Sequence, residues 1–181
     1  LNVHNSEGVQ YAEPKLKMMG IEAVRSSTPA VIRDSIKKTL GIIMNGCEED
    51  VQKYIADEKK VFLELPFEDV AFPRGCKEMS KWIGFESGKP YKSGTPIHVK
   101  GAILYNEQLK RQKLETKYEP IRDGDKIKFC YLKMPNILGE HVISSPGHLP
   151  KELDLNKSID YEKQFDKSFI EPIKTILDVI G

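Results

Sequence analysis

The sequence predicts an α+β domain dominated by helices, with a helical hairpin, further packed helices and a small antiparallel sheet. Two observations carry this prediction. Thr-Pro pairs at residues 28–29 and 95–96 each precede apolar residues at helical spacing, whereas residues 125–133 alternate apolar and polar side chains as a strand does. The 181 residues are 39% hydrophobic and 30% charged, which supplies a core and excludes wholesale disorder.

Residues 1–28 are expected to form a hairpin and a connector, which precede the main domain over residues 29–181. Asn5-Ser6-Glu7-Gly8 has the composition of a turn, and the strand-like residues Val9-Gln10-Tyr11 follow it. Residues 13–25 then form the connector that leads to the first long helix.

The first long helix is expected over residues 29–45. Thr28 is suited to the N-cap, and Pro29 suits the first helical position, where its missing N–H costs nothing. Asn45-Gly46 tolerates a left-handed backbone and is expected to close the helix. The apolar residues at helical spacing are Ile32, Ile36, Leu40 and Ile43.

A second helix over residues 48–65 would pair with the first as an antiparallel hairpin. Its first turn is acidic, which suits the positive end of the helix dipole, and Pro66 ends it. Aromatic residues within 66–94 are scattered among Gly, Pro, Lys and Ser. We therefore expect irregular, partly buried structure there.

The sequence pattern in the second half of the chain predicts two more helices and the sheet. Residues 96–110 form a helix after the second Thr-Pro signal, and residues 125–133 form a strand with residues 139–145 as its short partner. A last helix begins at Ser158 or Asp160. It contains a proline at position 172, which is expected to kink it.

The sequence holds no pattern typical of an autonomous enzyme. Its four histidines form no H-E-x-x-H motif, and it has no G-x-S-x-G, P-loop lysine or glycine-rich dinucleotide fingerprint. Cys47, Cys76 and Cys130 lack zinc-knuckle or C-x-x-C spacing, so we interpret them as core thiols in a reducing compartment. No apolar run approaches the roughly 20 residues that span a bilayer. We expect no catalytic residue, metal site or membrane contact in this chain.

Cations concentrate in the connector, although the whole chain has a net charge of only +1. Lys15, Lys17 and Arg25 flank Gly20, and residues 26–28 (Ser-Ser-Thr) add hydroxyl and backbone donors at a helix start, which suits phosphate. A solvated surface explains the same residues, so these observations alone leave both interpretations open. Further cations on and after the expected helices are Arg33, Lys37, Lys38, Lys110, Arg111, Lys113 and Lys117.

The runs 11–22 (YAEPKLKMMGIE) and 26–29 (SSTP) are similar to the start of the thumb domain in family B DNA polymerases, specifically the replicative polymerases of T-even-like phages. Residues 20–25 (GIEAVR) fit the looser signature of the wider family. The resemblance extends over nearly the whole chain and is weakest at residues 66–94. The other segments that carry the resemblance are 96–101, 104–106, 136–140, position 146, 149–152 and 167–172.

The resemblance implies a thumb that holds the primer–template duplex behind the active site and touches phosphates and the minor groove. It makes residues 1–28 the hairpin and connector from palm to thumb, and residues 29–181 the thumb. Glu171 stands where the phage relatives carry lysine, which weakens the expectation that the last helix grips DNA. The implied nucleic-acid-binding residues are Lys15, Lys17, Arg25, Ser26 and Ser27, followed by Lys100 and Lys167.

The parent enzyme implied by the resemblance is a nucleotidyltransferase of viral DNA replication in the host cytoplasm, with Mg²⁺ at its own active site. Its palm, fingers and exonuclease domains would be partners, and a sliding clamp would bind a C-terminal tail beyond Gly181. The fragment itself is expected to be inactive. The leading Leu1 favours an excised domain over a subunit of a split polymerase. The alternative is a thumb-like subunit of a split polymerase, or an assembly module that does not bind DNA.

Overall fold

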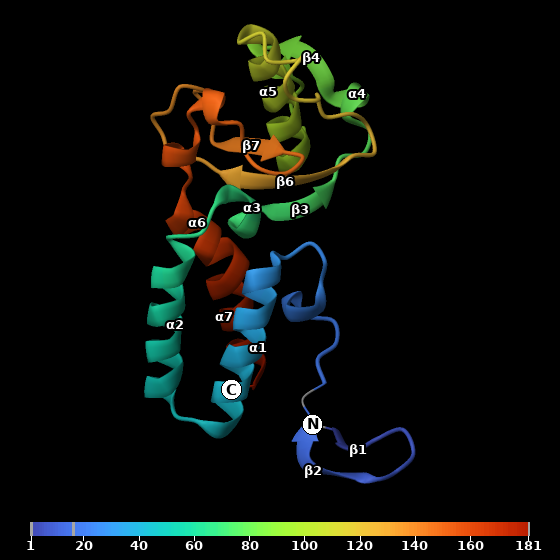
Figure 1. Ribbon diagram of the computed structural model, residues 1–181, viewed down its shortest axis with the longest axis vertical. Helices are drawn as coiled ribbons and strands as arrows, with labels where there is room; N and C mark the ends of the chain where they lie inside the picture. Colours follow the sequence, from blue (N-terminus) through green and yellow to red (C-terminus); the bar gives the residue numbers. More distant parts are fainter. Residues whose placement is uncertain (1, 16, 181) are drawn as a thin grey trace.

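The computed structural model describes residues 2–15 and 17–180. Figure 1 shows a small N-terminal hairpin, a group of long helices, and a sheet with a further helix at the other end of the molecule. This α+β, mainly helical architecture confirms the predicted fold class, while the division at residue 28 stays a prediction. The elements in chain order are β1 (Asn2–His4), β2 (Gln10–Lys15), η1 (Glu22–Val24), α1 (Ala30–Asn45), α2 (Glu48–Phe62), α3 (Phe67–Val70), β3 (Phe72–Gly75), α4 (Met79–Trp82), β4 (Ile83–Glu86), β5 (Lys89–Tyr91), α5 (Ile97–Arg111), β6 (Lys126–Tyr131), β7 (Val142–Ser145), η2 (Lys151–Leu153), η3 (Asn156–Ser158), α6 (Tyr161–Phe165), η4 (Asp166–Ile170) and α7 (Glu171–Ile180).

The helical hairpin of α1 and α2 is confirmed, but both ends of α1 differ from the prediction. Pro29 holds the N-cap position and no side chain caps this end, so Thr28 is not the expected cap. Gly46 has φ −118° and is extended, not left-handed. It is needed for a different reason, because an added Cβ would lie 2.9 Å from the Ile42 carbonyl oxygen.

Residues 66–94 are more regular than expected. They form α3, β3, α4 and the two-stranded hairpin β4–β5. The missed strand β3 pairs antiparallel with β6, from Phe72 opposite Phe129 to Gly75 opposite Lys126. A four-residue strand paired with a partner more than 50 positions away leaves no periodic signal in its own sequence.

The sheet has the order β3-β6-β7, and α5 packs on β7. The β6–β7 pair confirms the predicted partnership of the two segments. Gly101 permits close packing of α5, because an added Cβ would lie 2.7 Å from the Ser144 backbone nitrogen. The Ser144 hydroxyl also donates to the His98 carbonyl oxygen at 2.8 Å.

The last helix begins after Asp160, whose Oδ1 accepts from the Lys163 backbone N–H at 3.1 Å. The π-helical segment η4 separates α6 from α7 and ends two residues before Pro172, while the kink expected at this proline stays a prediction. Gln164 links this helix to α3 and to β6. Its Nε2 donates to the Val70 carbonyl oxygen at 2.7 Å, and its Oε1 accepts from the Tyr131 backbone N–H at 3.1 Å.

Candidate functional site

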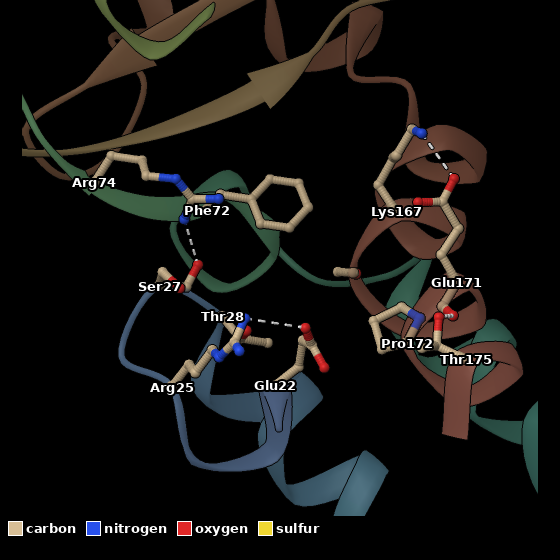
Figure 2. Close-up of a pocket in the computed structure, with 11 residues that line it drawn as sticks. Glu22, Arg25, Ser27, Thr28, Phe72, Arg74, Lys167, Glu171, Pro172 and Thr175 are labelled. Carbon is tan, nitrogen blue, oxygen red and sulfur yellow. Dashed lines mark hydrogen bonds and ion pairs between the residues drawn. The ribbon is translucent and has the colours of Figure 1, made fainter. Parts of the chain in front are cut away.

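A hollow of about 310 Å³ lies between the connector, β3 and the last helix. Figure 2 shows Arg25 and Ser27 on the connector side and Lys167 on the helix opposite. The fold therefore brings together three of the residues predicted from sequence. Arg74, which sequence reasoning missed, also lines the hollow, together with the carboxylates of Glu22 and Glu171.

The two predicted cations of this hollow each carry a carboxylate partner. Arg25 Nη1 lies 3.3 Å from Glu22 Oε1, and its Nη2 donates to the Gly20 carbonyl oxygen at 3.1 Å. Gly20 has φ +73°, so a residue without a side chain suits this turn. Lys167 Nζ lies 2.7 Å from Glu171 Oε1, and this hydrogen bond raises the pKa of Lys167.

Arg74 differs from these two cations because backbone carbonyls and aromatic rings hold it. Its Nη1 donates to the carbonyl oxygens of Ser27 at 2.5 Å and Pro73 at 2.7 Å. The guanidinium carbon lies 5.5 Å from the ring centre of Phe72 and 5.4 Å from that of Phe129, within cation–π range. Burial lowers the pKa of Arg74, but arginine keeps its charge in proteins. Among the described residues, Arg74 forms no ion pair.

A second hollow of about 480 Å³ adjoins the first and shares Ser27 and Arg74 with it. Ser26 lines this second hollow, as do Lys126 and Lys128 of β6. Lys128 Nζ donates to the Glu68 carbonyl oxygen at 2.7 Å, so part of its capacity is used within the fold. We call residues 25–28 with Arg74 the connector site.

The remaining predicted residues lie elsewhere. Lys17 is exposed on the coil after β2 and lines neither hollow. Lys15 ends β2 opposite Asn2, and its side chain falls outside what the structure describes. Lys100 is on α5, where its Nζ lies 3.9 Å from Glu140 Oε2 and 4.8 Å from the centre of the Tyr91 ring. It is not part of the connector site.

No three His, Cys, Asp or Glu side chains of the described residues are placed to hold a metal ion together. Cys76 and Cys130 are buried, and burial raises the pKa of Cys76 to about 11. Cys47 contradicts the expectation of a core thiol: it is exposed at the start of α2, with its Sγ 3.3 Å from Asp50 Oδ2. Within the described residues, no helix is both long and apolar enough to cross a membrane.

Comparison with known proteins relates the chain to DNA polymerases. It is 30% identical over 190 residues to the DNA-directed DNA polymerase of Enterobacteria phage T4, an alignment that covers 100% of this chain and 20% of that polymerase. It is also 30% identical over 181 residues to the DNA-directed DNA polymerase of Escherichia phage RB69, covering 96% of this chain and 19% of that polymerase. The chain is related to phage DNA polymerases. It spans about a fifth of their length, and no protein-family model matches it.

Proposed function

We propose that this chain is the thumb of a family B replicative DNA polymerase of the T-even-like phage type. It would hold the primer–template duplex behind the active site and contact phosphates and the minor groove. The observation that carries this proposal is the end-to-end similarity of the chain to one portion of two phage DNA-directed DNA polymerases. The connector site supports it, because cationic and hydroxyl groups converge there on two adjoining hollows.

The arrangement suits a contact that must accept any sequence. Phosphate contacts position a protein on DNA without reading bases, and each one releases condensed counterions. Arg25 and Lys167 are paired with carboxylates at the surface, and such exposed pairs are worth little, so exchange of a carboxylate for a phosphate costs little. Arg74 is already held in place, so it would lose little side-chain freedom on binding.

The wider protein is part of the same proposal. Nucleotide transfer with Mg²⁺ would take place in the palm, with fingers and exonuclease domains as further partners and a sliding clamp bound through a C-terminal tail. Replication of viral DNA would place the protein in the host cytoplasm. The 181-residue chain alone should not extend a primer on a template with any added metal, and an extension assay tests this.

Duplex binding by the 181-residue chain at several salt concentrations tests the proposed role. Fluorescence anisotropy with labelled primer–template duplexes of unrelated sequence should give similar affinities for each of them. The logarithm of the binding constant should fall linearly with the logarithm of salt, by about 0.9 per phosphate contacted. An assembly module without DNA contact would show no saturable binding, and that result would contradict the proposal.

A further inference from the structure

A third hollow, of about 340 Å³, lies beside the β4–β5 hairpin and is separate from the connector site. Lys89 and Lys92 line it from the hairpin side, and Lys100 lines it from α5. Ser93 and Thr95, in the turn before α5, also border it. The sequence predicted only Lys100 in this group, because the other two lysines fall in the region of weakest resemblance.

Lys89 and Lys100 both pair with the carboxylate of Glu140, which is almost buried. Glu140 is 8% exposed, and its Oε1 accepts from the Tyr91 hydroxyl at 2.7 Å and lies 3.0 Å from Lys89 Nζ. Lys100 Nζ lies 3.9 Å from the other oxygen of Glu140. Burial alone would raise the pKa of Glu140, but the hydrogen bonds from Tyr91 and Lys89 lower it, so the carboxylate stays charged.

The ring of Tyr91 fixes the same two ammonium groups from a second direction. Lys89 Nζ lies 5.8 Å and Lys100 Nζ 4.8 Å from its centre. Solvated lysines extend freely into water and lose rotamer entropy when they bind a ligand. Here that freedom is already reduced, and the 3.9 Å contact of Lys100 is too long for a strong hydrogen bond.

The charge balance of the hollow favours an anion. Three lysines line the hollow together with the carboxylate of Glu86, whose Oε2 already accepts from the Ser93 backbone N–H at 2.5 Å. Glu140 pairs with two of these lysines, Lys89 and Lys100. Lys92 Nζ donates to the Lys81 carbonyl oxygen at 2.9 Å, which leaves its charge uncompensated by a carboxylate among the described residues. Each ammonium group has three donor hydrogens, so all three lysines keep capacity for a ligand.

We infer that this hollow is a second phosphate-binding site, in which Lys89, Lys92 and Lys100 bind the phosphodiester backbone of the DNA duplex. Glu140 and Tyr91 act as positioning residues that hold Lys89 and Lys100 toward the ligand. The inference rests on the proposed function and adds a contact at the β4–β5 hairpin. Tyr91 is only 7% exposed, so the site has no stacking surface for a base and recognises phosphate alone.

Lysine footprinting and a double variant test the inference in the 181-residue chain. Acetylation of the wild-type chain should be slowed at Lys89 and Lys100 when duplex is added, and not at Lys59 on α2. Lys89→Met with Lys100→Met keeps the apolar stems and should flatten the log–log salt slope by about two units. The matched control is Lys59→Met with Lys60→Met, because Lys59 is also held by a carboxylate, 2.7 Å from Glu162 Oε2. Circular dichroism checks that both variants fold.

The outcomes separate this site from the proposed function. Wild-type binding with a steep salt slope, no protection at Lys89 and Lys100, and an unchanged slope in their double variant would overturn the second site and leave the proposed function standing. Equal flattening by the control variant would also overturn it. A wild-type chain that does not bind duplex at all would overturn both.

Discussion

Arg74 fastens the connector to the sheet through its hydrogen bond to the Ser27 carbonyl oxygen. Arg74→Met keeps the apolar stem over Phe72 but removes this bond and the charge. We expect the free energy of unfolding to fall by about 1–3 kcal/mol, since hydrogen bonds to charged groups contribute on this scale. We also expect weaker duplex binding, and urea denaturation with anisotropy measures both. Unchanged stability and unchanged affinity would remove Arg74 from the connector site.

Lys15 and Lys17 test whether the strand end and the coil before the connector site face phosphate. Changing both to alanine should weaken duplex binding about equally across sequences and flatten the salt slope by roughly two units. Folding should change by less than about 0.5 kcal/mol, because surface lysines contribute little to stability. Lys53→Ala on α2 is the control. If the folded double variant keeps the wild-type slope, these lysines belong to the solvated surface.

At the scale of elements, the start of α7 holds a charge that opposes DNA binding. Glu171 forms an ion pair with Lys167, which lies one helical turn earlier in the chain. Glu171→Gln removes the negative charge and frees the ammonium group, so duplex affinity should rise and the salt slope should steepen by about one unit. Anisotropy at three salt concentrations measures this. An unchanged slope would mean that the last helix does not reach the duplex.

The 3₁₀ turn η2 is tied to the loop after α5 through Glu152. Lys117 donates to Glu152 Oε1, and the Tyr118 hydroxyl donates to Oε2 at 2.7 Å. These two hydrogen bonds lower the pKa of Glu152 to about 2 from its ordinary value of 4.5. A lowered folded-state pKa means that the carboxylate stabilises the fold above pH 4.5 and that this contribution is lost as pH falls toward 2.

Glu152→Gln should therefore flatten the loss of stability between pH 4.5 and 2. Urea denaturation at several pH values measures the free energy of unfolding of both proteins. Glu115→Gln, an exposed glutamate in the loop after α5, is the control. Parallel pH profiles for wild type and Glu152→Gln would show that the contact contributes nothing to the fold.

Local signals predicted the long elements, and long-range pairing determined the rest. Pro29 and Pro96 mark the starts of α1 and α5 because a proline preference belongs to a single position. The strand β3 escaped prediction because its identity depends on β6. The connector cations were found through their clustering and the family resemblance. Arg74 was not, because nothing beside it in the sequence indicates that Phe129 and Ser27 will lie next to it.

In the whole molecule, the connector site lies where the connector runs between the sheet and the last helix. The sheet supplies Arg74 to the site, and Lys167 of the last helix lies opposite the connector across the first hollow (Figure 2). In Figure 1 the α1–α2 hairpin extends away from the sheet, and the β4–β5 hairpin lies at the opposite end of the molecule. A duplex bound as proposed would contact the connector site and the β4–β5 hollow but not the outer face of α2.

Site-specific photocrosslinking to a primer–template duplex tests whether the connector site contacts DNA and the outer face of α2 does not. A benzophenone side chain would replace either Ser26, which is exposed beside the second hollow, or Gln52, which is exposed on α2. After irradiation of the 181-residue chain with labelled duplex, we expect a DNA adduct from position 26 that disappears at high salt, and none from position 52. Adducts from position 52 alone, or equal adducts from both positions, would contradict this expectation.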